Sequence, residues 1–180
     1  MVARINAKDE TMWEHTGRRR PDFAAKPGPG QESVWDYPRP PALVADSRRI
    51  VVSRDDIIVA DTRRSLRLCE TASPPTFYLP PDDVQLHSLV PADGASICEW
   101  KGAAIYLALK TDPETAVAWS YPRPRARYDR LKNYIAFYPA LVKCLVDGEQ
   151  VRPQPGRFYG GWVTSDIVGP FKGEPGTGHW

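Results

Sequence analysis

Short runs of β-branched and alternating residues recur along the chain and predict strands joined by tight turns. Residues 49–53 and 57–61 are two such runs, and the polar residues 54–56 between them predict a hairpin. Residues 65–70 alternate polar and apolar side chains, which is typical of a half-buried strand. We therefore expect two hairpin-linked strands, followed by a third strand with one face in the core.

The alternation in residues 65–70 turns one carboxylate toward the interior. Leu66, Leu68 and Glu70 occupy every second position and so share one face of the predicted strand. A carboxylate on an inward face costs several kcal/mol unless it is paired or hydrogen-bonded. Glu70 is therefore either a structural carboxylate that fixes the Pro74-Pro75 corner or part of a functional site, and the sequence leaves both readings open.

The later part of the chain continues the pattern of short strands. Further runs rich in aliphatic and aromatic residues predict strands over residues 84–90, 104–109, 116–121 and 134–138. The second and third of these form an antiparallel pair if residues 112–114 make the turn. Asp147-Gly148, flanked by apolar runs, is the strongest hairpin signal in the chain.

Proline shapes the expected architecture. The chain has 19 prolines in 180 residues, roughly twice the average usage of about 5%. Because proline interrupts helices and central strands, we expect short elements joined by rigid corners. We predict an all-β fold with little helix, in which residues 32–180 form a single domain of antiparallel strands in two angled sheets, tent-like or sandwich-like. Residues 1–31 are expected to form an extended N-terminal arm.

Charge balance limits the classes of partner. The 24 basic and 22 acidic side chains leave a net charge of +2, which argues against a protein that mainly grips nucleic acid. No apolar run approaches the roughly 18 residues of a membrane span. A local basic cluster leaves a weaker alternative, a nucleotide-handling protein that grips phosphate with Arg123, Arg125, Arg127 and Arg130.

Cysteine usage indicates a reducing compartment. Cys69, Cys98 and Cys144 are odd in number and form no C-x-x-C pair, and residues 1–20 carry charges throughout, unlike a signal peptide. We expect a reduced, cytoplasmic protein. Three scattered cysteines and three scattered histidines do not offer a tetrahedral zinc site, so we predict no metal and no cofactor.

Aromatic residues gather around two short motifs. The pattern W-x-Y-P-R-P occurs at 35–40 and again at 119–124. In each copy the Trp and Tyr are expected to pack on the core while the Arg faces water, although the second copy is equally compatible with a cleft wall. The expected ligand-binding residues are Tyr78, Cys98, Trp100, Trp119, Tyr121 and Tyr134.

Two functions fit these residues. The first is a ligand-binding or accessory protein with an aromatic-lined pocket around Glu70 and Lys101. The alternative is a cofactor-free enzyme in which Glu70 and Lys101 form the catalytic acid–base pair, each shifting the other's pKa. The expected partner is a small molecule rather than nucleic acid or membrane. The sequence is also compatible with a homodimer.

Seven motifs in order along the chain resemble one known family. They are E-S-V-W-D-Y-P-R-P-P at 32–41, E-T-x-S-P-P-T-x-Y at 70–78, C-x-W-K-G-x-A at 98–104, W-S-Y-P at 119–122, Y-I-A-F-Y-P at 134–139, V-D-G-E at 146–149 and F-Y-G-G-W-V at 158–163. Together they resemble the domain of unknown function 427 family over about residues 32–180. The family sometimes carries a nucleotidyltransferase-like label. The resemblance implies a small, mostly β fold with two sheets meeting at an angle, and it implies no particular activity.

Overall fold

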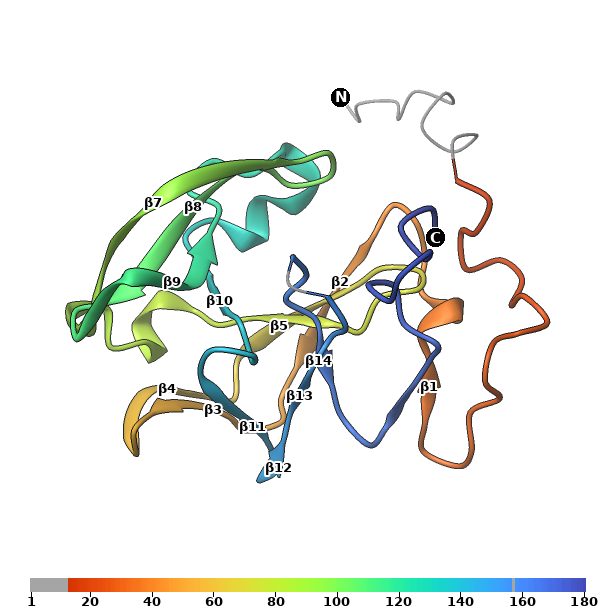
Figure 1. The fold of residues 1–180 in the computed structure, drawn as a ribbon, viewed down its shortest axis with the longest axis horizontal. Coiled ribbons are helices and arrows are strands. Elements are labelled where there is room, and N and C mark those ends of the chain that lie inside the picture. The colour runs from red at the N-terminus through yellow and green to blue at the C-terminus, as the bar shows by residue number, and fades with distance from the viewer. Residues whose placement is uncertain (1–12, 157) are drawn as a thin grey trace.

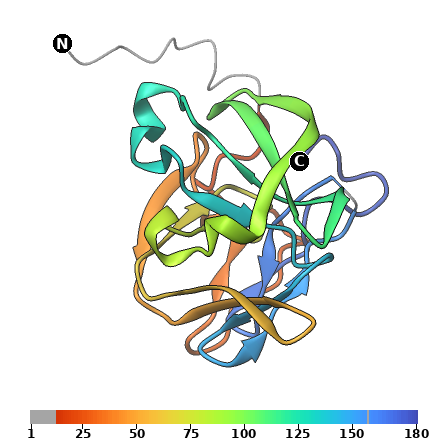
Figure 2. The same cartoon turned by 90° about the vertical axis from the view of Figure 1, so that its left-hand side faces the viewer.

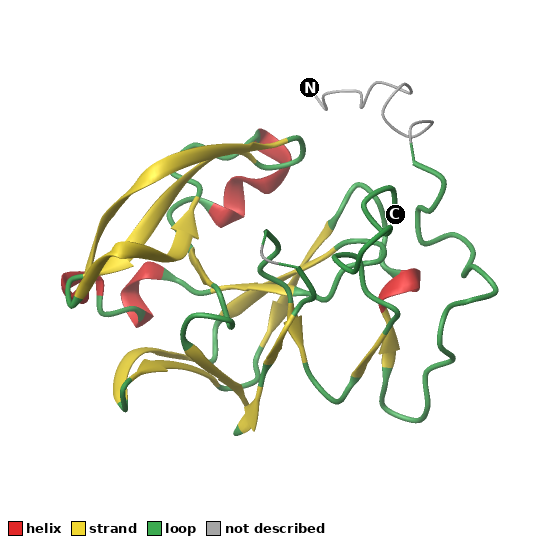
Figure 3. Ribbon diagram, in the orientation of Figure 1, coloured by secondary structure: helices red, strands yellow, loops and turns green. Residues whose placement is uncertain are grey.

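The computed structural model describes residues 13–156 and 158–180, and these residues fold mainly into short strands. Figure 3 shows strands joined by long loops, with helical structure confined to short turns. These turns are 3-10 helices and are named η1 (Val34–Asp36), η2 (Pro81–Asp83), η3 (Leu86–Ser88) and η4 (Ala126–Leu131). The prediction of an all-β fold with little helix is confirmed.

Two four-stranded sheets dominate the architecture. The first has the order β10-β9-β8-β7, with strands β7 (Leu89–Cys98), β8 (Gly102–Leu109), β9 (Asp112–Ser120) and β10 (Ile135–Phe137). The second has the order β12-β11-β3-β4, with strands β3 (Ile50–Arg54), β4 (Ile57–Thr62), β11 (Lys143–Val146) and β12 (Glu149–Gln150). All pairings in both sheets are antiparallel.

Smaller sheets link the two large ones. A three-stranded sheet contains β2 (Ala42–Asp46), β5 (Ser65–Cys69) and β6 (Thr76–Tyr78). Two further pairs are formed by β1 (Glu32–Ser33) with β15 (Ile167–Val168) and by β13 (Arg152–Pro153) with β14 (Trp162–Val163). Figures 1 and 2 show the β7–β10 sheet above and the β3–β4 hairpin below, so that the two large sheets face each other across the fold.

Two hairpins follow directly from local sequence. Asp55 and Asp56 connect β3 to β4 with φ of 49° and 64°, and Asp147 and Gly148 connect β11 to β12 with φ of 48° and 87°. Two consecutive positive φ values match the twist of a tight antiparallel hairpin, and Asp and Gly adopt them at low cost. Both predicted hairpins are confirmed.

The predicted strand over residues 84–90 is wrong in its central part. Ser88 N and Ser88 Oγ both bond to the carbonyl of Gln85, at 2.9 and 2.7 Å, and close the turn η3. The Gln85 N–H is taken by Val59 O at 2.8 Å. Because a serine hydroxyl competes for backbone acceptors, an alternating pattern here becomes a turn, and the strand β7 begins only at Leu89.

The predicted turn at residues 112–114 is also wrong, since the turn lies two residues earlier. Leu109 pairs with Asp112, whereas Ala108 already pairs with Ala116. Pro113 therefore falls in a bulge of β9, where its missing N–H removes no ladder hydrogen bond. A proline that reads as a turn in the sequence is accommodated inside a strand.

The largest core lies between the sheets. Trp162 and Phe77 are almost fully buried there and their rings pack 5.0 Å apart. A separate cluster forms around Trp35, whose ring centre lies 5.0 Å from that of Phe23 and 5.1 Å from that of Trp180. The expected N-terminal arm thus packs on the domain through Phe23, while its residues 1–12 lie outside the described residues.

An ion network ties β1, β2 and β5 together. Arg67 donates to both oxygens of Glu32 at 3.0 Å and lies 3.7 Å from Asp46, which also accepts from Arg48 at 2.7 Å. Burial alone would raise the pKa of Asp46, but the hydrogen bonds from Arg48 outweigh it and hold that pKa below its usual value. The Asp46 side chain is only 9% exposed, so solvent screens this network weakly.

Acid should therefore unfold the protein partly through Asp46. A carboxylate with a lowered folded-state pKa stabilises the fold above its unfolded pKa of about 4, and this contribution is lost as the pH falls through the folded-state value. We expect Asp46→Asn to lower the free energy of unfolding by about 2 kcal/mol at pH 7. Below about pH 4, the free energy of unfolding of this variant should fall less steeply with decreasing pH than that of the wild type. Urea denaturation across pH measures both effects. The exposed Asp55→Asn is the control, and an unchanged acid limb in Asp46→Asn would contradict the prediction.

Candidate functional site

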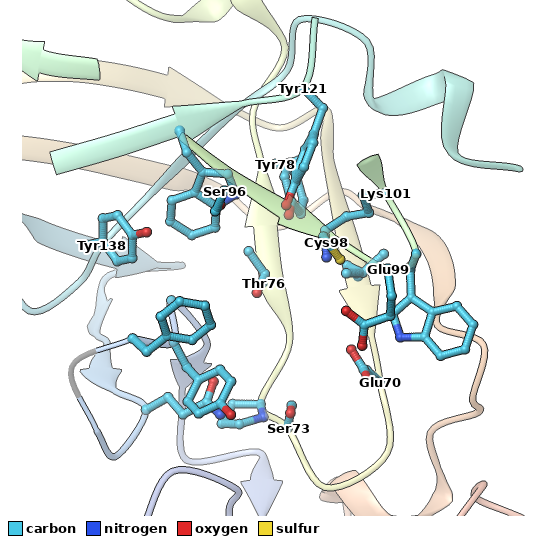
Figure 4. A pocket seen from close by; sticks show the side chains of 18 of the residues that line it. Glu70, Ser73, Thr76, Tyr78, Ser96, Cys98, Glu99, Lys101, Tyr121 and Tyr138 are labelled. Carbon is cyan, nitrogen blue, oxygen red and sulfur yellow. The ribbon is translucent and has the colours of Figure 1, made fainter. Parts of the chain in front are cut away.

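A pocket of about 270 Å³ opens where β5, β6 and the β7–β9 strands meet the C-terminal loops. Figure 4 shows its polar and aromatic side chains converging from these separate segments. The wall residues are Leu68, Glu70, Ser73, Pro74, Thr76, Tyr78, Ser96, Ile97, Cys98, Glu99, Trp100, Lys101, Tyr106, Trp119, Tyr121, Tyr138, Gln154, Phe158, Tyr159, Gly160 and Lys172. The pocket therefore combines carboxylates, ammonium groups, a thiol and a dense set of aromatic rings.

Local structure explains how these side chains reach one cavity. Trp119 lies on β9 and Tyr121 follows it two positions later, so both project to the same side. Cys98 ends β7, and Lys101 stands in the tight turn to β8, where Gly102 adopts a φ of 101°. The Lys101 carbonyl accepts a hydrogen bond from Arg125 N at 2.9 Å, which fixes the turn against the segment before η4.

Seven of the eight residues singled out from the sequence line the pocket, namely Glu70, Tyr78, Cys98, Trp100, Lys101, Trp119 and Tyr121. Tyr134 does not line it. Its backbone N–H bonds to Leu131 O at 3.0 Å and closes the turn between η4 and β10, and its ring packs on the second core cluster. The exposed Arg123, Arg125, Arg127 and Arg130 likewise lie outside the lining.

Glu70 forms its ion pair with Arg39 rather than with Lys101. Arg39 Nε donates to Glu70 Oε1 at 3.1 Å, and Arg39 Nη2 donates to Thr71 O at 2.9 Å. The Arg39 side chain is 1% exposed, so the expectation that this arginine of the first W-x-Y-P-R-P segment faces water is wrong. Burial lowers the pKa of Arg39, and the charge of Glu70 opposes that effect. The pair is satisfied because each group offsets the desolvation of the other.

Lys101 is buried without a carboxylate partner. Within the described part of the chain it forms no ion pair, although Glu70 acts on it at longer range. Its ammonium lies 5.6 Å from the ring centre of Tyr121, and Figure 4 shows the side chain running toward Cys98. Burial would lower the pKa of Lys101, but Tyr121, Cys98 and Glu70 together outweigh it and raise that pKa, so the amine stays protonated at neutral pH.

Tyrosine hydroxyls form a second polar group in the pocket. Burial raises the pKa values of Tyr78 and Tyr121, so both phenols remain neutral hydrogen-bond donors at physiological pH. The Tyr78 ring lies 6.2 Å from the Trp119 ring and 6.3 Å from the Tyr121 ring, measured between ring centres. On the same wall, Tyr106 donates to Ser96 Oγ at 2.9 Å. The aromatic rings thus supply directed polar atoms as well as apolar surface.

Several lining residues escaped the sequence analysis. Glu99 and Lys172 add charge, and Tyr159 adds a further ring. The Gly160-Gly161 pair could have indicated that this loop packs closely on another part of the chain, because a Cβ on Gly160 would stand 2.2 Å from the Trp119 ring. Only glycine permits that close approach, so this loop is fitted against the pocket wall.

The described residues contain no group of three or more His, Cys, Asp or Glu side chains that could hold a metal ion. Over the same residues, no helix is both long and apolar enough to cross a bilayer. The side chains of the pocket offer a protonated amine, phenol and indole donors, a thiol and two carboxylates.

Comparison with known proteins gives a family and no activity. No curated protein matches the chain. A family model does match it, over residues 42–149, a range that contains both Glu70 and Lys101. That model is described as Domain of unknown function (DUF427), which confirms the resemblance found in the motifs, and the chain belongs to this family.

Proposed function

We propose that the protein binds a small organic molecule in the pocket around Glu70 and Lys101, as a ligand-binding or accessory protein. The main support for the proposal is the pocket itself, in which charged groups and aromatic rings from distant segments surround a cavity of about 270 Å³. This volume is near the lower end of ligand pockets, about 300–1,000 Å³, which suits a small ring-containing molecule. Aromatic and apolar side chains together with a small number of fixed polar groups are the usual composition of such sites.

An unsatisfied donor supports the same proposal. The Nε1–H of Trp100 is buried and has no hydrogen-bond partner among residues 13–156 and 158–180. A buried N–H without an acceptor costs about 1–3 kcal/mol, and a bound ligand is one way in which such a group becomes satisfied. Because Trp100 belongs to the pocket wall, a turn of its ring toward the cavity would let an occupant of the pocket supply that acceptor.

The test is a thermal-shift screen of small ring-containing acids, amines and neutral compounds. We expect at least one compound to raise the melting temperature, because a ligand that binds only the folded state stabilises it. Trp119→Phe and Trp119→Ala should weaken the binding of that compound by at least tenfold, since the Trp119 ring forms part of the wall. Phe23→Ala, an aromatic change outside the lining, is the control. The proposal would be contradicted if no compound raised the melting temperature, or if the compounds that did so bound equally well to the Trp119 variants.

The alternative is a cofactor-free enzyme, and the presence of Glu70 and Lys101 on one wall favours it. In that case Glu70→Gln should fold, should still bind the ligand and should lose turnover, because the amide cannot accept a proton. If Glu70→Gln instead unfolds the protein, the carboxylate serves mainly to neutralise Arg39. Calorimetric binding and urea denaturation of the same variant separate these outcomes.

A further inference from the structure

The inner wall of the pocket carries more hydrogen-bond donors than acceptors. Lys101 is 8% exposed, and its ammonium has three N–H donors but no carboxylate in ion-pair contact within the described residues. Figure 4 shows the Lys101 side chain running toward the Cys98 thiol, which is only a weak acceptor. A buried cation that is left in this state is costly, so the site favours an occupant with negative charge.

The neighbouring phenols add further hydrogen-bond donors to this wall. The rings of Tyr78 and Tyr121 lie 6.3 Å apart between centres, and each hydroxyl adds one O–H donor to the pocket wall. The Trp119 ring lies 6.2 Å from the Tyr78 ring, and its indole N–H can only donate. Lys101 is close to these donors, because its ammonium lies 5.6 Å from the centre of the Tyr121 ring. In Figure 4 the side chains of Tyr78, Tyr121 and Lys101 point into the same part of the pocket, near Cys98.

The carboxylates of the pocket do not compensate for this excess. Glu70 is already bound to Arg39 at 3.1 Å. Glu99 is exposed, and Figure 4 shows it beside Glu70, away from the two phenols. The remaining cation, Lys172, donates to the main-chain oxygen of Trp180 at 2.7 Å. That hydrogen bond leaves the charge of Lys172 without an ion pair among the described residues, as for Lys101, and of these two lysines Lys101 is the one whose ammonium lies over the Tyr121 ring.

From this arrangement we propose that the inner end of the pocket is an oxyanion site. Lys101 and the hydroxyl groups of Tyr78 and Tyr121 bind one carboxylate or phosphate group of an organic ligand, while Trp119 packs against the ligand's ring. This assignment rests on the proposed ligand-binding function and specifies the class of ligand. Because the exposed Glu99 adds negative charge to the same pocket, a singly charged carboxylate is favoured over a doubly charged phosphate.

Benzoate, phenyl phosphate and benzyl alcohol are suitable probes, because they share a ring and differ in charge. Titration calorimetry at constant ionic strength and pH 7 should give at least tenfold tighter binding for benzoate than for benzyl alcohol, and weaker binding for phenyl phosphate than for benzoate. Lys101→Met should remove the preference for benzoate over benzyl alcohol, since a charge-assisted hydrogen bond is lost. The exposed Lys110→Met should keep it. Tyr121→Phe, which keeps the ring, should weaken benzoate severalfold and leave benzyl alcohol unchanged.

The outcomes separate this inference from the proposed function. Equal binding of benzoate and benzyl alcohol, or a preference for benzoate that survives both Lys101→Met and Tyr121→Phe, would overturn the oxyanion site. If benzyl alcohol then still binds in a Trp119-dependent way, the pocket keeps its ligand-binding function. If phenyl phosphate binds more tightly than benzoate through Lys101, the oxyanion site stands and its expected preference for a carboxylate is wrong.

Discussion

Replacing Trp162 by alanine is expected to lower the free energy of unfolding by about 3–5 kcal/mol, the range for deleting a large buried ring. Trp162 is fully buried and packs on Phe77 with ring centres 5.0 Å apart. Its indole N–H donates to Phe137 O at 3.1 Å, so the change also leaves a buried carbonyl without that donor. Because Trp162 lies between β6 and β10, the cavity would open where the sheets are joined.

Urea denaturation of the variant measures this loss. Phe158→Ala is a matched control, because that ring is 74% exposed and its removal should change the free energy of unfolding by less than about 0.5 kcal/mol. Trp162→Phe should fall between the two, since it keeps most of the apolar surface and loses the hydrogen bond. A loss below about 1 kcal/mol for Trp162→Ala would show that the core between the sheets does not depend on this ring.

Elements set by local signals were predictable from the sequence. The hairpins at Asp55-Asp56 and Asp147-Gly148 depend on backbone conformations that only a few residue types adopt cheaply, so the residues themselves indicate the turn. Pro113 shows the limit of such signals. Whether a proline ends a strand or sits in a bulge depends on the neighbouring strand, and the sequence does not specify which strand that is.

Most of the candidate site residues could be predicted from the sequence, but not which side chains pair with each other. Strand alternation predicted an inward Glu70, whereas β5 ends at Cys69 and the Glu70 side chain is 21% exposed. The residues around Lys101 were recognisable as a strand entrance. The partner of Glu70 is Arg39, which lies 31 positions earlier in an extended segment without periodicity. The wall formed by Tyr159, Gly160 and Lys172 comes from Gly- and Pro-rich loops, in which no repeat predicts where a side chain points.

Arg39 is the second position at which a single change should have a large effect. Its guanidinium donates to Glu70, to Thr71 O and to His15 O, at 3.1, 2.9 and 3.3 Å, and so joins three separate segments. Breaking a buried ion pair costs about 3–5 kcal/mol. The Glu70 side chain is 21% exposed and regains some hydration, so we expect Arg39→Met to lower the free energy of unfolding by about 2–3 kcal/mol.

Two further variants distinguish charge from geometry at Arg39. Arg39→Lys keeps the positive charge, but one ammonium cannot reproduce a planar fork that donates in three directions, so most of the loss should remain. Combining Arg39→Met with Glu70→Gln should cost less than the sum of the two single changes, because the uncompensated carboxylate is removed as well. Urea denaturation of the four proteins in this cycle measures the coupling between the two side chains.

The same cycle bears on the pocket, because Arg39 neutralises Glu70 and thereby leaves Lys101 without an ion pair among the described residues. Without the guanidinium, Glu70 would be free to turn its charge toward Lys101, and the affinity for benzoate should fall in Arg39→Met and recover in the double variant. If Arg39→Lys is as stable as the wild type, and benzoate binds Arg39→Met unchanged, the arginine neither joins these segments nor keeps the carboxylate away from the lysine.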